Sequence, residues 1–278
     1  MKEICSINGA IQPISKAHIS VNSIEAEYGF GVYESIKIRN NTIYFLDKHI
    51  ERLFNSASLI DLDHIFLPVQ IESFVRNFVK ELGEESCNLK LLLYGGATKE
   101  KSNLFILSTV PFYPNRKWYK EGVSLKSYTY ERWMPQAKTL NMLASYYLYK
   151  KSKNEGCYDA LLLDHNGNMI EGTRTNIYFT KGKQIYSPEK KQILQGVTML
   201  TLEKVLQKNL QFKLIHESIP LQDISKFDGM FLTSTSSKIL PVKQVDSFSF
   251  HSISKDILEL IEMYERALDN SKGEFSLL

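Results

Sequence analysis

Residues 156–179 read GCYDALLLDHNGNMIEGTRTNIYF. The apolar run at 159–163 predicts a strand, and the polar residues at 164–168 predict a hairpin turn into a second strand at Met169 and Ile170. Glu171 follows and opens the polar turn EGTRTN. The stretch therefore predicts paired strands with a carboxylate at a strand end, where loops often carry functional side chains.

The rest of the chain alternates between strand and helix signals, which predicts a mixed α and β (α+β) fold. β-rich segments at 32–38 and 42–46 flank Arg39-Asn40-Asn41 and predict a hairpin. Asp47 is the predicted N-cap of a helix over 48–60, whose apolar residues follow helical spacing. Further helices are predicted at 69–82, 141–154, 197–209 and 254–267, and further strands at 89–94, 103–110, 123–129 and 229–233.

The stretch from 111 to 122, PFYPNRKWYKEG, separates the two halves of this pattern. It holds two prolines and a glycine and has no regular period, which is typical of a linker. We therefore expect two α/β domains, 1–115 and 116–278. By its position in the sequence, Lys138 is expected to belong to the C-terminal domain.

The composition is that of a soluble globular protein, with 43% hydrophobic and 23% charged residues in a chain of 278. A net charge of +3, spread along the chain, argues against nucleic acid or a membrane surface as partners. No apolar run reaches the length of a membrane span, and the N-terminus lacks the apolar run of a signal peptide. The three cysteines have no metal-site spacing, so we expect a reduced, cytoplasmic protein with no disulfide and no metal.

Polar segments at other predicted strand and helix ends are candidates for chemistry. Lys138 lies in PQAKTLNML, just before a predicted helix, and Gly196-Val197-Thr198 opens another helix. Residues 233–237, TSTSS, follow the predicted strand GMFL. The last two have features of anion sites, because a helix N-terminus offers N–H groups and a positive dipole end, to which hydroxyls add hydrogen bonds. Taken singly, each also has an ordinary explanation as a surface lysine, a helix N-cap or a polar loop.

Taken together, the segments resemble one family. Their order and spacing from about residue 20 to 245 are similar to those of the class IV aminotransferases, which include branched-chain aminotransferases, D-amino-acid aminotransferases and aminodeoxychorismate lyases. The matching motifs are YGFGVYES (28–35), HIERL (49–53), AKTLNML (137–143), GCYDALLLDHNGNMIEGTRTNIYF (156–179), LQGVT (194–198) and FLTSTSSKILPV (231–242). The resemblance implies a two-domain D-amino-acid-aminotransferase-like fold that binds pyridoxal 5′-phosphate (PLP).

The resemblance also implies a role for each matched residue. Lys138 matches the lysine that binds PLP covalently and acts as the catalytic base. Glu171 matches the carboxylate that pairs with the pyridine nitrogen of the cofactor, and Arg52 in HIERL matches the arginine that binds its phosphate. Tyr33, in GVYE, matches an aromatic residue near the substrate. The remaining matched cofactor-binding residues are Val197, Thr198, Ser234 and Thr235.

The implied activity is transfer of an amino group between an amino acid and a 2-oxo acid. The loop 94–103, YGGATKEKSN, lacks the Arg-x-His of the D-amino-acid type, and Met142 stands where the lyase type tends to have arginine. These departures favour a branched-chain or other hydrophobic amino acid as substrate. A D-amino-acid aminotransferase, an aminodeoxychorismate lyase and a catalytically silent relative that binds PLP or phosphate remain alternatives.

Two further expectations concern substrate binding and assembly. Arg174, in EGTRTN, either binds the substrate carboxylate through its planar fork or is a surface residue of the turn. The resemblance implies a homodimer, with the loop 94–103 as the candidate to complete the partner's active site. His49, at a helix start, is expected to be structural.

Overall fold

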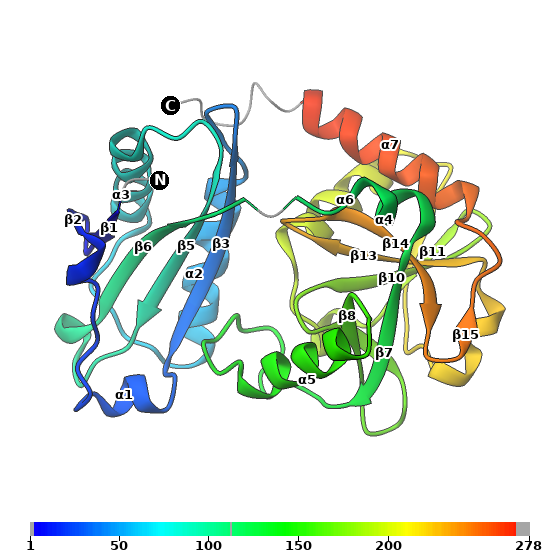
Figure 1. Ribbon diagram of the computed structural model, residues 1–278, viewed down its shortest axis with the longest axis horizontal. Coiled ribbons are helices and arrows are strands. Elements are labelled where there is room, and N and C mark those ends of the chain that lie inside the picture. Colours follow the sequence, from blue (N-terminus) through cyan, green and yellow to red (C-terminus); the bar gives the residue numbers. More distant parts are fainter. Residues whose placement is uncertain (1–2, 112, 271–278) are drawn as a thin grey trace. The chain divides into compact units, whose positions relative to one another are not determined.

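The computed structural model describes residues 3–111 and 113–270, and these residues form two compact units (Figure 1). The first unit contains residues up to 111 together with Ala137–Asn141. The second contains Tyr113–Gln136 and the residues from Met142 onward. Both units combine a sheet with helices, so the predicted α+β class is confirmed.

The first unit is built on an antiparallel sheet with the strand order β2-β1-β6-β5-β3-β4. Its central strands alternate between buried and half-buried side chains, as expected when one face of a sheet is covered. The strands are β1 (Ile4–Ile7), β2 (Ala10–Pro13), β3 (Gly31–Arg39), β4 (Thr42–Ile43), β5 (Cys87–Tyr94) and β6 (Asn103–Thr109). Short helices at Ile14–Lys16 (η1), Ile24–Glu27 (α1) and Lys99–Lys101 (η2) lie in the connections.

Two amphipathic helices, α2 (Leu46–Leu59) and α3 (Pro68–Leu82), form the core of this unit with the sheet. α2 packs against β3 and against α3, and α3 also contacts β1. The buried positions of α2 include Leu46, Ile50, Leu53 and Ala57, whose spacing places them on one helix face. This face packs against β3. The polar residues His49 and Ser56 of α2 are buried with it.

The hairpin between β3 and β4 confirms the predicted turn, but its second strand is shorter than expected. Asn40 and Asn41 have φ angles of 49° and 60°, the left-handed conformation that a two-residue hairpin turn requires. Phe45 also has a positive φ, 56°, which ends the extended chain and makes this residue the N-cap of α2. The prediction that Asp47 caps the helix is wrong, because the helix begins at Leu46 and Asp47 lies in its first turn.

The second unit contains a sheet with the order β12-β11-β10-β13-β14-β7-β8-β9. An additional pairing between β9 and β10 closes six of these strands into a ring. The ring consists of β10, β13, β14, β7, β8 and β9. The strands are β7 (Val123–Thr129), β8 (Asp159–Leu163), β9 (Met169–Gly172), β10 (Asn176–Lys181), β11 (Gln184–Ser187), β12 (Lys213–His216), β13 (Gly229–Ser234), β14 (Lys238–Val245) and β15 (Phe248–Ser249), which pairs with β14. Within this ring, β8 and β9 have every side chain buried.

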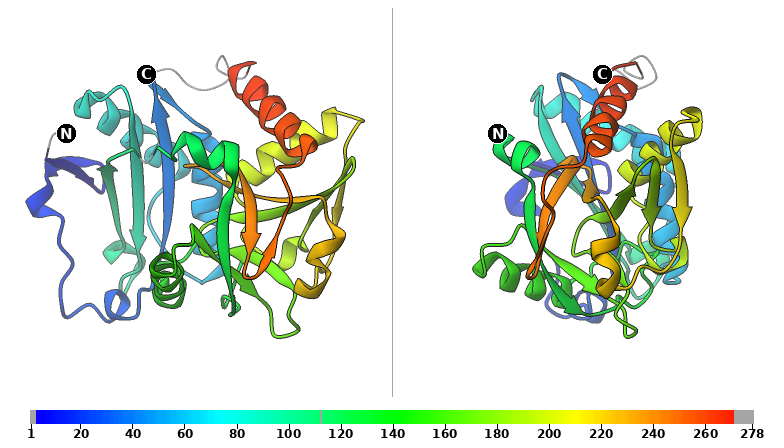
Figure 2. Two further views of the ribbon diagram at one scale, coloured as in Figure 1. Left: turned by 45° about the vertical axis from the view of Figure 1, so that its right-hand side comes forward. Right: turned by 90° about the vertical axis from the view of Figure 1, so that its right-hand side faces the viewer.

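The helices of the second unit pack on this sheet. They are α4 (Arg116–Glu121), α5 (Leu143–Asn154), α6 (Val197–Lys208) and α7 (Lys255–Asn270), with short turns at Lys190–Gln192 (η3) and Leu221–Lys226 (η4). α6 contacts β13 and β12, and α7, drawn in red in Figure 2, contacts β13, β14 and α6. No helix among the described residues is both long and apolar enough to cross a membrane.

Two observations change the expected domain description. The predicted linker 111–122 contains the helix α4, which packs against β14. Within the described residues, 111 belongs to the first unit and Tyr113 to the second. Lys138 belongs to the first unit and not to the C-terminal domain. The reason is a backbone pairing: the N–H of Tyr33 donates to the Lys138 carbonyl at 2.9 Å, and Val32 forms a β-bridge with Thr139.

Candidate active site

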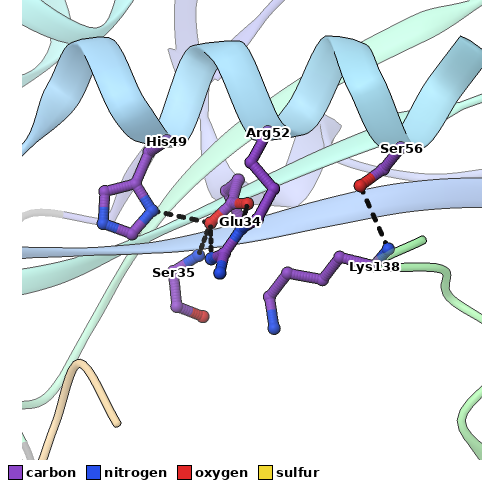
Figure 3. A network of polar contacts seen from close by, with 6 residues as sticks. All are labelled: Glu34, Ser35, His49, Arg52, Ser56 and Lys138. Atoms are coloured by element: carbon purple, nitrogen blue, oxygen red, sulfur yellow. Dashed lines mark hydrogen bonds and ion pairs between the residues drawn. The ribbon is translucent and has the colours of Figure 1, made fainter. Parts of the chain in front are cut away.

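Lys138 is held against the first unit by its main chain. Besides the bond from Tyr33, its own N–H donates to the hydroxyl of Ser56 on α2 at 3.0 Å, and Ser56 is fully buried (Figure 3). The Lys138 Nζ lies 4.3 Å from the centre of the Tyr33 ring. The structure therefore brings together the predicted catalytic lysine and the predicted substrate-contacting tyrosine.

Arg52 lies on α2 and meets a carboxylate of the neighbouring strand. Its Nε donates to Oε1 of Glu34 at 2.6 Å and its Nη2 donates to Oε2 at 2.7 Å, so the pair is bidentate. Figure 3 shows Arg52 and His49 on the same helix, both directed at Glu34 on β3. The His49 Nδ1 lies 2.7 Å from Glu34 Oε2. Neither Glu34 nor its orienting role was anticipated from the sequence, although HIERL places His49 and Arg52 three positions apart on one helix face.

The electrostatics of this cluster follow from its burial. Burial by itself raises the pKa of Glu34, but the charge of Arg52 and the hydrogen bonds from Arg52 and His49 outweigh it and hold the pKa far below its usual range. Burial also lowers the pKa of His49, with Glu34 opposing this shift and the charges of Arg52 and Lys138 adding to it. An ionised carboxylate can only accept, so the His49 Nδ1 that lies 2.7 Å from it carries the proton and donates.

In the second unit, Glu171 lies near the end of β9 and is only 3% exposed. It was expected to open a turn, but it is a strand residue paired with Leu162 on β8 and Asn176 on β10. Its Oε1 accepts from the Nε of Arg132 at 2.6 Å, and Nη2 of Arg132 lies at the same distance. Its Oε2 accepts from the Leu194 N–H at 3.2 Å. Arg132 was missed by sequence reasoning, because 39 residues separate it from Glu171.

Asn176 ties Glu171 to the other predicted cofactor-binding segments of this unit. On β10, it pairs with Glu171 of the neighbouring strand β9 and with Thr233 of the other neighbour, β13. Its amide donates to the Leu194 carbonyl at 2.6 Å. A Cβ on Gly196 would lie 2.3 Å from Asn176 Oδ1, so glycine allows the loop to pass this close. The structure thus brings together Glu171, the start of α6 and the end of β13.

The start of α6 has the features of an anion site. Gly196 is its N-cap and supplies no side-chain oxygen to the first turn, so those N–H groups receive no side-chain cap. Val197 and Thr198, the first two helical residues, are buried. The hydroxyl of Ser234 at the end of β13 lies 2.6 Å from that of Ser237 and accepts the Ser237 N–H at 3.1 Å, which folds the half-buried Thr235 into a tight turn.

These residue types fit PLP. The cofactor carries an aldehyde, a pyridine nitrogen and a phosphate, and the chain supplies an amine (Lys138), a carboxylate held by an arginine (Glu171) and an uncapped helix start (Val197). Arg52 adds a guanidinium of the kind that binds phosphate. No group of three or more His, Cys, Asp or Glu side chains suited to a metal occurs within 3–111 and 113–270.

Arg174 lies in the turn between β9 and β10 and is exposed. Its guanidinium carbon lies 4.4 Å from the centre of the Tyr149 ring and 5.4 Å from that of Tyr158. Nearby, Asp159 is fully buried and accepts hydrogen bonds from Thr173 and Thr175. Burial raises the pKa of Asp159, and the hydrogen bond from Thr173 and the charge of Arg174 offset part of this rise. The turn after Glu171 is therefore fixed from inside by Asp159, and the Arg174 guanidinium lies against the rings of Tyr149 and the buried Tyr158.

Comparison with known proteins identifies the class to which this fold and these residues belong. Residues 31–245 match the family described as Amino-transferase class IV, and the chain belongs to that family. It is an enzyme of the PLP-dependent aminotransferase type, which transfers an amino group between an amino acid and a 2-oxo acid.

The names of individual relatives also state a substrate. A D-alanine aminotransferase of Bacillus licheniformis is 28% identical over 274 residues, covering 95% of each chain. A probable branched-chain-amino-acid aminotransferase of Rickettsia typhi is 28% identical over 271 residues, covering 88% of this chain and 90% of the relative. The solved branched-chain aminotransferase of the archaeon Thermoproteus uzoniensis, with norvaline, superposes with a TM-score of 0.84 at 22% identity, over 96% of this chain and 95% of that one. This likeness confirms the predicted class IV fold.

Proposed function

We propose that the enzyme acts on a branched-chain or other hydrophobic amino acid. The observation that carries this proposal is the sequence of the 94–103 connection between β5 and β6, which contains neither arginine nor histidine. The relative from Rickettsia typhi and the solved enzyme of Thermoproteus uzoniensis, both named for branched-chain substrates, support the same substrate class. The D-amino-acid type has an Arg-x-His in this stretch, so its absence here argues against that type of substrate.

We further propose that the predicted residues bind the cofactor. Lys138 would bind its aldehyde, Arg52 its phosphate, and Glu171 its ring nitrogen. The remaining residues proposed to donate hydrogen bonds to the phosphate are Val197, Thr198, Ser234 and Thr235. The support is the residue-by-residue match to the family motifs, together with the fixed carboxylate and the uncapped helix start.

The bound cofactor supplies an electron sink for the bonds of the substrate α-carbon. The residues of the chain do the rest. The Nζ of Lys138, as a free amine, accepts the proton from the α-carbon and returns it. Arg132 and the Leu194 N–H hold both oxygens of Glu171, so the carboxylate keeps its direction. Tyr33, beside the lysine, provides an aromatic wall for the substrate.

Arg174 is proposed to bind the substrate carboxylate. Its guanidinium carbon lies 4.4 Å from the centre of the Tyr149 ring and 5.4 Å from that of Tyr158. These ring contacts hold the guanidinium by cation–π attraction, which does not require its N–H donors. A carboxylate approaching in the plane of the guanidinium can accept two parallel hydrogen bonds.

A D-amino acid is the second candidate substrate, because the relative from Bacillus licheniformis is a D-alanine aminotransferase that matches over nearly the whole length. One experiment separates the candidates. The purified enzyme is mixed with single L- and D-amino acids, and loss of the cofactor absorption band is followed for each. We expect L-leucine, L-isoleucine or L-valine to react and D-alanine to remain inert. Reaction with D-alanine alone would overturn the proposed substrate.

The homodimer and the cytoplasmic location are also proposals. Large apolar side chains are exposed on α5 and just before Lys138, including Leu143, Tyr147 and Trp133, and a second copy is the occupant that the family resemblance suggests. Free thiols at Cys5, Cys87 and Cys157 suit a reducing compartment. Sedimentation that finds only an active monomer would contradict the dimer.

A further inference from the structure

Glu34 is a carboxylate placed in an apolar core. On the same face of β3 lie Val32 and Ile36, and all three side chains are fully buried. A buried ion pair is weak evidence for stability, because well-packed apolar residues of similar volume often stabilise a fold at least as well. The placement of Glu34 therefore calls for an explanation other than stability, and its contacts supply one.

The contacts of Glu34 fix the orientation of Arg52. Both carboxylate oxygens are engaged, one by Nε at 2.6 Å and the other by Nη2 at 2.7 Å. A guanidinium is planar, so fixing one edge through two bonds also fixes the direction of its plane and of Nη1. The Arg52 side chain is 13% exposed, so its neighbours leave it little freedom to reorient.

His49 fixes the carboxylate in turn. Its ring donates from Nδ1 to Glu34 Oε2 at 2.7 Å, and the Ser35 N–H approaches the same oxygen at 3.3 Å (Figure 3). His49 is 1% exposed and precedes Arg52 by one helical turn. The three side chains form a relay in which the histidine orients the carboxylate and the carboxylate orients the arginine.

We propose that Glu34 and His49 are positioning residues, which hold the Arg52 guanidinium in one orientation for the phosphate group of PLP. The inference rests on the proposed cofactor role of Arg52 and adds two residues to it. An arginine that is already oriented loses little side-chain freedom on binding, so the relay strengthens phosphate binding without touching the ligand.

The test compares PLP with pyridoxal, which lacks the phosphate. Dissociation constants for both are measured by titration of the full-length chain after its cofactor has been removed. The variants are Glu34→Gln, Arg52→Ala and a matched pair at position 49, His49→Asn, which keeps an N–H donor, and His49→Leu, which does not. Loss of a charge-assisted contact predicts that Glu34→Gln and Arg52→Ala weaken PLP about ten- to a hundredfold and leave pyridoxal within about twofold. His49→Leu should show a smaller loss of the same kind, and His49→Asn should resemble the wild type.

Several results would overturn the proposal. Equal losses for PLP and pyridoxal in Glu34→Gln would show a merely structural role, and no loss would show that Glu34 is irrelevant to the phosphate. If Glu34→Gln does not fold, the pair at position 49 decides, and a His49→Leu variant with unchanged preference for PLP refutes the relay. A wild-type chain that binds PLP and pyridoxal equally would instead refute the cofactor assignment of Arg52 itself.

Discussion

Replacing Arg132 with methionine removes the guanidinium from Glu171 while filling much of the same volume. The side chains of Arg132 and Glu171 are 12% and 3% exposed, so water compensates little for the lost contacts. Removing one partner of a buried ion pair costs about 3–5 kcal/mol. Because the Leu194 N–H still donates to Glu171, we expect the lower end, about 3 kcal/mol in the free energy of unfolding.

The assay is urea unfolding of the cofactor-free chain, with the single variant Glu171→Met and the double variant Arg132→Met/Glu171→Met as controls. The double variant removes both charges, so it should recover most of the stability that the single variant loses. The single variant should also bind PLP more weakly, since its carboxylate is no longer oriented.

Two outcomes would refute this reasoning. A loss below about 1 kcal/mol in Arg132→Met would mean that the pair behaves like a solvent-exposed one. A double variant that loses the sum of both single losses would mean that Arg132 and Glu171 are not coupled.

Three further predictions follow from other contacts. Because Glu34 has a lowered pKa in the folded chain, its stabilising contribution is present above its unfolded pKa of about 4.3 and is lost as the pH falls below that value. The stability gap between wild type and Glu34→Gln in urea should therefore narrow from pH 7 to pH 3, and a constant gap would contradict the assignment. Arg174→Ala should raise KM for amino acids more than for amines without a carboxylate, and equal effects on both would make Arg174 purely structural. Gly196→Ala places a Cβ 2.3 Å from Asn176 Oδ1 and should weaken PLP binding about tenfold by displacing the start of α6. An added Asn176→Ala substitution should restore part of that affinity, and no restoration would refute the steric explanation.

Local sequence signals predicted the elements that depend on a few neighbouring residues. The paired asparagines at 40 and 41 predicted the β3–β4 turn because both tolerate a positive φ. The start of α6 at Val197 followed from the change to helical periodicity after Gly196. The alternation in β3 did not reveal that Glu34 faces the core, because a carboxylate in a strand is ordinarily assigned to solvent.

The errors have a common physical origin in long-range contacts. β1 and β2 were not predicted, and β1 is held in place by pairing with β6, about a hundred residues along the chain. The role of Arg132 depends on Glu171, 39 residues away, and no local pattern shows that the two side chains meet. The placement of Lys138 depends on its pairing with β3, which periodicity near Lys138 does not reveal.

That pairing has a consequence for the synthesis of the protein on the ribosome. Residues 137–141 belong to the first unit, yet the 24 residues before them, Tyr113–Gln136, belong to the second. A nascent chain that has emerged only as far as β6 cannot complete its first unit, because the segment that pairs with Gly31 and Tyr33 has not yet left the ribosome. The lysine thus arrives at its place by closing a unit begun a hundred residues earlier. Gene fragments cut at the apparent boundary near residue 112 would sever the reactive amine from the strand that positions it.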